Sequence, residues 1–183
     1  MPDRGGILAL DLSFSSTGWA YSDFGNKPLY GSWALGKLAD PGRAYAVLED
    51  EIFDAIAMHG PRAIVYEAPL PTNRPSKVGE NTRQNNDSAI GMIRLGGIVE
   101  MAAWRMSIRC FHQHCGQARA AVLGKAPIGK TEHVKGVIMD WAKRRGWTPQ
   151  CDDEADALLL LQHAAVTMDR TNKAHFNRHG IEI

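Results

Sequence analysis

The sequence lacks the marks of a membrane protein and of a disulfide-rich secreted protein. No apolar run approaches the ~20 residues that a membrane-spanning helix needs, and residues 1–4 lack the basic and then apolar layout of a signal peptide. Cysteine is scarce: the chain has three, an odd number that argues against a disulfide scaffold and for a reducing compartment. We therefore expect a cytoplasmic protein with no membrane partner.

Net charge is also nearly absent, but the charges are unevenly distributed. The formal net charge is +1. Residues 37–58 hold five acidic side chains against two basic ones, whereas residues 104–149 hold nine lysines and arginines against two acids. This asymmetry predicts that one face of the protein can meet phosphate groups while another does not.

Length and patterning predict one α/β domain with a single mixed sheet. The 183 residues suit one domain, which we expect over residues 1–168, followed by a polar tail over 169–183. Short turns between the first three strands favour an antiparallel meander, and a helix then leads to a strand parallel to the first. The predicted strands are 6–12, 16–22, 29–36, 62–67 and 107–112, and the predicted helices are 41–59, 87–106, 116–123, 130–145 and 153–167, with a loop over 70–86.

Carboxylates stand at the edges of three apolar segments. Asp11 and Glu67 each end an apolar strand, and Asp153 and Asp156 open an apolar helix. A buried acid is costly unless its charge is paired, and hard divalent cations prefer oxygen ligands. Two such ions about 3.5–4 Å apart can hydrolyse a phosphodiester. The pattern favours a nuclease metal site; acids that cap a turn or complement a helix dipole are the alternative.

Helical spacing leaves one ligand of this site open. Asp153 and Asp156 are three residues apart and Asp152 and Asp156 are four apart, so either pair shares a helix face. Spacing alone therefore does not decide between Asp152 and Asp153. His163, seven residues after Asp156, is a minor candidate on the same helix.

Several short motifs occur together in an informative order. Residues 9–19 read Ala-Leu-Asp-Leu-Ser-Phe-Ser-Ser-Thr-Gly-Trp, residues 86–89 read Asn-Asp-Ser-Ala, and residues 153–158 read Asp-Glu-Ala-Asp-Ala-Leu. Between them, Arg119 and Lys130 flank Val-Leu-Gly. Together with Glu67, this set resembles the RuvC family of Holliday-junction resolvases, members of the RNase H-like superfamily, and it extends over most of the chain from residue 7 to 165.

The resemblance implies an RNase H-like fold and a crossover-junction endodeoxyribonuclease that works as a homodimer on four-way junctions or other branched DNA. It implies that Asp11, Glu67, Asp153 and Asp156 are catalytic acids that bind Mg²⁺, with Mn²⁺ as a substitute, and its Asp-x-x-Asp-Ala-Leu spacing selects Asp153 over Asp152. Leu70 replaces the family's junction-probing aromatic in a longer, proline-rich loop, which suggests altered substrate preference. DNA contacts are expected from Arg74, Lys77, Arg83, Arg119, Lys125 and Lys130.

Two other motifs suggest different functions. Residues 124–131 match the phosphate-loop pattern of nucleotide-binding proteins, although the preceding residues favour a helix where such a loop needs a buried strand. Cys110, His112, His114 and Cys115 are ligand types for zinc, but zinc sites usually take two separated ligand pairs and no second pair is evident. A nucleotide-binding protein and a non-catalytic branched-DNA-binding protein thus remain the alternative functions.

The predicted helix over 87–106 carries more apolar residues than one buried face needs. Glycines at 91, 96 and 97 lower its helix propensity but permit close approach. We expect this helix at the homodimer interface; packing of its second stripe on helix 130–145 of the same chain is the alternative. The first stripe consists of Ile90, Ile93, Ile98 and Met101. The second stripe consists of Met92, Leu95, Val99 and Ala102.

Overall fold

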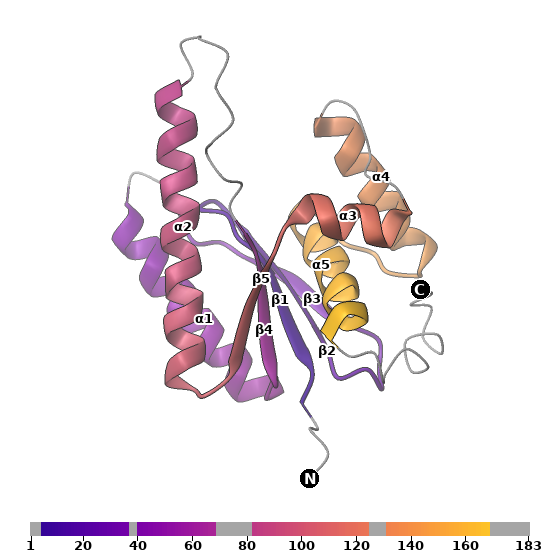
Figure 1. Cartoon of the computed structure of the whole chain (residues 1–183), viewed down its shortest axis with the longest axis horizontal. Coiled ribbons are helices and arrows are strands. Elements are labelled where there is room, and N and C mark those ends of the chain that lie inside the picture. The colour runs from indigo at the N-terminus through magenta and orange to yellow at the C-terminus, as the bar shows by residue number, and fades with distance from the viewer. Residues whose placement is uncertain (1–4, 37–39, 69–81, 125–130, 169–183) are drawn as a thin grey trace.

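A five-stranded mixed sheet lies at the centre of the protein (Figure 1). The computed structural model describes residues 5–36, 40–68, 82–124 and 131–168. The strand order is β3-β2-β1-β4-β5, with β1 to β3 antiparallel and β4 and β5 parallel to β1. This confirms the predicted meander and the predicted parallel pairing. The strands are β1 Ile7–Asp11, β2 Thr17–Ser22, β3 Leu29–Trp33, β4 Ala63–Glu67 and β5 Arg109–Gln113.

Strand β1 lies in the middle of the sheet because its first four residues are apolar and fully buried. Successive side chains of a strand point to opposite faces. Ile7 and Ala9 belong to the core on one face, and Leu8 and Leu10 belong to the core on the other. Asp11 follows the alternation of Ile7 and Ala9, so its side chain lies on their face.

Helices α1 Pro41–His59 and α2 Thr82–Arg105 cover the face of Leu8 and Leu10 (Figure 1). Asp40 caps α1 by accepting a hydrogen bond from the Arg43 amide at 3.3 Å. Gly60, in the left-handed conformation with φ of 57°, ends the helix as the sequence predicts.

Helices α3 Cys115–Leu123, α4 Thr131–Arg144 and α5 Asp152–Met168 cover the opposite face (Figure 1). Helix α5 is buried along most of its length and packs on β1 and β2. Its first turn lies directly on β2, where a Cβ atom at Gly18 would come within 2.0 Å of the carbonyl oxygen of Asp153. Glycine at 18 therefore permits this close approach.

Three predicted boundaries were wrong. Helix α2 begins at Thr82 instead of residue 87, so residues 82–86 are helical and not part of the predicted loop. Apolar periodicity reports only a buried face, and the first turn of α2 is a polar stretch without such a signal. Strand β5 begins at Arg109 instead of residue 107, because α2 ends through a turn at Ser107 with a positive φ of 54°. Strand β3 ends at Trp33 and not at residue 36.

Two further expectations concern segments that the structure does not describe: the loop residues before Thr82 and the polar tail over 169–183. In the part of the chain that is described, no helix combines the length and the hydropathy needed to cross a membrane.

Candidate metal centre

Asp11 and Glu67 are the last residues of the neighbouring parallel strands β1 and β4. Their side chains lie on the same face of the sheet, and the two carboxyl groups form a hydrogen bond. Burial first, and then the contact with Glu67, raise the pKa of Asp11 well above its usual value. Two acids held this close form a site whose charge a cation can neutralise.

Helix α5 contributes two more acids to the same end of the sheet. Asp156 is 6% exposed, and burial raises its pKa. Burial also raises the pKa of Asp153, although a hydrogen bond with Ser16 opposes that effect. Both carboxylates lie close enough to Asp11 to raise its pKa. The structure thus brings together the four acids that the sequence singled out.

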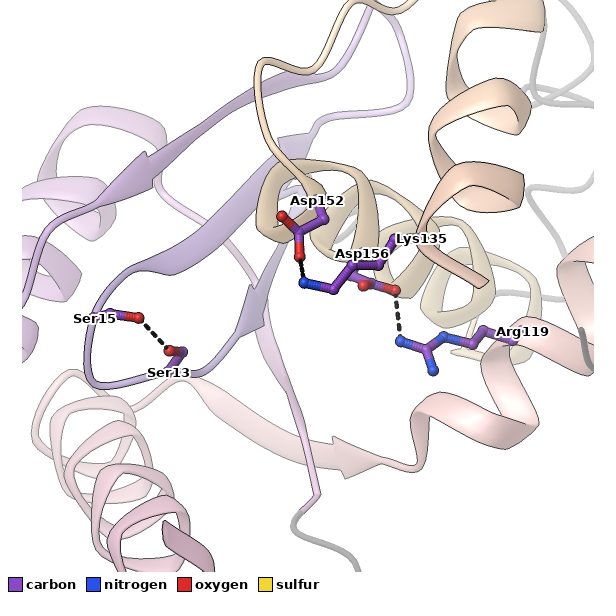
Figure 2. Close-up of polar contacts among 6 residues, drawn as sticks. All are labelled: Ser13, Ser15, Arg119, Lys135, Asp152 and Asp156. Carbon is purple, nitrogen blue, oxygen red and sulfur yellow. Dashed lines mark hydrogen bonds and ion pairs between the residues drawn. The ribbon is translucent and has the colours of Figure 1, made fainter. Parts of the chain in front are cut away.

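Asp152 has a different surrounding from its neighbour Asp153. It forms an ion pair with Lys135 of α4 (Figure 2), and that contact lowers the pKa of Asp152. Asp152 is therefore held by the Lys135 side chain, whereas Asp153 lies close enough to Asp11 to raise the pKa of Asp11. The geometry separates two aspartates that helical spacing could not separate.

Arg119 of α3 forms an ion pair with Asp156 (Figure 2). One of its terminal nitrogens, Nη2, donates to Asp156 Oδ1 at 3.0 Å, and the Arg119 side chain is 28% exposed. Its Nε has no hydrogen-bond partner among the residues that the structure describes. Arg119 was expected at the DNA; it lies between the surface and the acids, a position that sequence reasoning did not foresee.

Sequence reasoning missed Cys115 as part of this centre. The Cys115 Sγ and one oxygen each from Asp11 and Glu67 all lie within 4.8 Å of one another. Cys115 is the first residue of α3 and is 7% exposed. A signal was present: Cys115 belongs to the run of zinc-ligand types at 110–115, but the partners in space are two carboxylates from distant strands.

The minor candidate His163 lies beside the centre. Its Nδ1 is 2.9 Å from the Gln113 side-chain oxygen, and Gln113 is paired with Glu67 across β4 and β5. Burial lowers the pKa of His163. The His163 ring therefore contacts the edge strand β5, and it does not belong to the group formed by Asp11, Glu67 and Cys115.

The other predicted DNA contacts cannot be placed. Arg74, Lys77, Lys125 and Lys130 fall outside the described residues, and Arg83 lies in the first turn of α2, where the structure describes only the backbone.

The phosphate-loop alternative fails in its context. The segment before Gly124 is helix α3, as expected, whereas a phosphate loop follows a buried strand.

Comparisons with known proteins support a single fold. No family model matches the sequence, and no match to a curated protein was significant. Among solved structures, the chain is similar to Thermus thermophilus RuvC in complex with a Holliday junction substrate, with a TM-score of 0.62, 14% identity, and coverage of 97% of both chains. A second T. thermophilus RuvC structure gives a TM-score of 0.58 at 14% identity, covering 96% of this chain and 97% of that one.

The yeast mitochondrial Holliday junction resolvase Ydc2 is similar too, with a TM-score of 0.52, 13% identity, and coverage of 96% of this chain and 85% of that one. Such low identity establishes architecture and not chemistry. The sheet order, the placement of the helices and these likenesses agree. The chain has the RNase H-like fold of the RuvC resolvases.

Proposed function

We propose that this protein is a divalent-metal-dependent endonuclease that cuts Holliday junctions or other branched DNA. The observation that supports it most is the convergence of Asp11, Glu67, Asp153 and Asp156, from β1, β4 and α5, on one end of a RuvC-like sheet. Four acids that converge from separate elements, with only Asp156 in an ion pair to Arg119 among the described residues, are what a site for hard cations requires.

The donor set fits Mg²⁺, with Mn²⁺ as a substitute. Carboxylate oxygens are the ligands these ions prefer, and the carboxyl groups of Asp11 and Glu67 lie within hydrogen-bonding reach of each other. Asp11, Glu67, Asp153 and Asp156 would hold the ions. When bound, the ions would polarise the phosphodiester and lower the pKa of the attacking water.

The rest of the centre keeps these acids in position. Arg119 holds Asp156 by an ion pair, and Ser16 holds Asp153 by a hydrogen bond. Gly18 lets the first turn of α5 reach the sheet. The Arg119 side chain is 28% exposed, and we assign contacts with DNA phosphates to it and to Arg74, Lys77, Arg83, Lys125 and Lys130.

A homodimer would bring two such centres to one junction, because a two-fold axis can match two strands of like polarity. Support comes from α2, on which Ile90, Ile93 and Trp104 are 46%, 56% and 81% exposed. Ile90 and Trp104 are two heptads apart, so they lie on one face of the helix. Gly97, on the same stripe, has no atom near an added Cβ, which would allow a second helix to approach.

The remaining apolar residues of α2 serve the protein's own core. Leu95, Val99 and Ala102 are fully buried in the core that α2 shares with α1 and the sheet. Gly91 and Gly96 make room for Phe14 and Tyr66 of the same chain. The alternative that a second stripe packs on α4 is wrong, because α4 covers the opposite face of the sheet.

The test of function is cleavage of a labelled four-way junction, a fork and a linear duplex, each with Mg²⁺, Mn²⁺ or EDTA. We expect cutting of the branched substrates with either metal and none in EDTA, with junction binding retained. Asp54→Asn is a matched control, since Asp54 is an exposed acid of α1 on the opposite face. Equal cutting of the linear duplex would contradict structure selectivity, and binding without any cutting would favour a non-catalytic DNA-binding protein.

The dimer has its own measurement. Light scattering should give about twice the 20.1 kDa chain mass. Ile93→Glu, on the exposed stripe, should convert the protein to a monomer, whereas Met58→Glu, at a 77% exposed position of α1, should not. A wild-type protein that stays monomeric on a junction would exclude the dimer.

A further inference from the structure

A thiol lies among the carboxylates of the candidate metal centre. The Sγ of Cys115 and oxygens of Asp11 and Glu67 lie within 4.8 Å of one another, and they come from α3, β1 and β4. Ligands on three separate elements of a folded core are held without help from a flexible loop. This is the arrangement of a three-ligand metal site, and its third ligand is a sulfur atom.

We propose that Asp11, Glu67 and Cys115 form a binding site for a thiophilic divalent cation, Zn²⁺, which excludes Mg²⁺ from the same centre. The binding site itself stands on the geometry of the three side chains; the competition with Mg²⁺ rests on the proposed nuclease function.

The donor chemistry separates the two cations. Mg²⁺ takes oxygen ligands and gains nothing from a thiolate, whereas Zn²⁺ binds cysteine sulfur and carboxylate oxygen, usually with four ligands. Zn²⁺ also binds mixed donor sites more tightly than the harder ions do. Three protein ligands leave one position open for water or for Asp156. A sulfur atom in this place thus favours Zn²⁺ at a centre otherwise built for Mg²⁺.

Zinc binds cysteine as the thiolate, so coordination displaces the proton of the Cys115 thiol. Burial first, and then the carboxylates of Glu67 and Asp156, raise the pKa of Cys115 far above its usual value. On binding, the S–H bond breaks, sulfur keeps the electron pair and donates it to the metal, and the proton passes to solvent. Zn²⁺ binding should therefore release a proton and should weaken as the pH falls.

The other two cysteines lie elsewhere and provide controls. Cys110 packs against the core on the α1 and α2 face, and Cys151 precedes α5. Neither belongs to the three-ligand group. Because the chain has three cysteines in all, replacing Cys110 and Cys151 with serine leaves Cys115 as its single thiol.

The experiment titrates this single-thiol protein with Cd²⁺, which reports coordination by sulfur through an ultraviolet thiolate-to-cadmium charge-transfer band. We expect the band to saturate at one Cd²⁺ per chain, to vanish when Zn²⁺ displaces Cd²⁺, and to be accompanied by proton release in weak buffer. Asp11→Asn in this background should weaken Cd²⁺ binding at least tenfold. Adding Cys115→Ser should remove the band.

Two outcomes would overturn the proposal: calorimetric Cd²⁺ binding without a charge-transfer band, or a band that Asp11→Asn leaves unchanged. Both use a protein with Cys115 intact, so they decide the matter even where Cys115→Ser does not fold. Circular dichroism of each variant checks the fold.

Competition is measured separately, as inhibition by Zn²⁺ of Mg²⁺-dependent junction cutting. We expect the single-thiol protein to be at least tenfold more sensitive to Zn²⁺ than the same protein with Cys115→Ser, and equal sensitivity would refute the competition. If neither protein cuts DNA, the proposed function fails while the absorption band still decides whether the binding site exists.

Discussion

The two faces of the central sheet are formed by the same strands, but they differ at the C-terminal ends of β1 and β4. On the face covered by α1 and α2, Leu8, Leu10 and Tyr66 are buried, and apolar packing continues to the end of the strands. On the face covered by α3, α4 and α5, Ile7 and Ala9 are followed by Asp11. Because side chains alternate, a register shift of one residue would turn the acids into the apolar core. Strand alternation therefore decides on which face of the sheet Asp11 and Glu67 lie.

The largest predicted effect comes from removing an acid from the face of the sheet that α3, α4 and α5 cover. Asp11→Asn and Glu67→Gln should each lower junction cutting by roughly 10³-fold or more, because on the proposed function several kcal/mol of transition-state stabilisation depend on the ions that these acids would hold. Junction binding, measured by mobility shift, should remain. A catalytically normal Asp11→Asn protein would exclude the site.

The matched change on the other face of the sheet, which α1 and α2 cover, is Leu10→Ala. It should cost about 2–5 kcal/mol of unfolding free energy, measured by urea denaturation, because it leaves a cavity in a close-packed core. The fraction that remains folded should still cut. If Leu10→Ala abolished cutting in a folded protein, the two faces would not be chemically distinct.

A smaller but mixed effect is expected at Gly18, where α5 touches β2. In Gly18→Ala the new methyl group would collide with backbone atoms of Asp153, so α5 must shift. We expect a loss of about 1–3 kcal/mol in stability together with a loss of cutting, since Asp153 and Asp156 move with the helix. Gly136→Ala is the control: Gly136 lies in α4 with open space around it, and alanine there should stabilise the helix by about 1 kcal/mol.

The ion pairs Arg119–Asp156 and Lys135–Asp152 should differ in how much they stabilise the fold. Arg119→Ala leaves the buried Asp156 without its partner and should cost about 1–3 kcal/mol. Lys135→Ala removes a pair in which the lysine is 47% exposed and should cost less than about 1 kcal/mol. Thermal unfolding of both variants at low and high salt makes the comparison. Equal losses would mean that burial does not distinguish the pairs.

Much of this architecture could be predicted because it depends on short stretches of sequence. The apolar run before Asp11, the similar run before Glu67, and the helix that opens at the aspartates each carry a local signal, and a helical crossover makes β1 and β4 parallel. Gly60 marked the end of α1 for an equally local reason. These local signals pointed to Asp11, Glu67 and Asp156 of the proposed site, and the family resemblance selected Asp153 over Asp152.

The rest depends on packing between distant elements. Nothing near Lys135 in sequence indicates that it pairs with Asp152, and Arg119 reaches Asp156 only because α3 packs beside α5. Cys115 was considered for zinc, but its partners were sought among nearby cysteines and histidines, whereas they lie about 50 and about 100 residues away in the chain. Such contacts can be identified only once the packing of the elements is known.

A further predicted effect is a pH dependence of stability without metal. Burial, followed by the contact with Glu67, raises the pKa of Asp11, so the folded protein holds this proton more tightly than the unfolded chain does. The unfolding free energy should therefore fall as the pH rises from the usual carboxylate range through the raised pKa, with a slope of at most about 1.4 kcal/mol per pH unit for one proton. Urea denaturation across that range should show a shallower slope for Asp11→Asn. An identical slope would contradict the assignment.

The position of α5 in the chain has a consequence for biosynthesis. This helix brings Asp153 and Asp156 and covers β1 and β2, yet every other described element precedes it. A chain emerging from the ribosome exposes its N-terminal part first. Until α5 has emerged, Asp11 and Glu67 lack their neighbours on α5, and Ile7 and Ala9 lack the helix that packs on their face of the sheet. On the proposed function, such a chain would gain its complete set of acids only after α5 has been made.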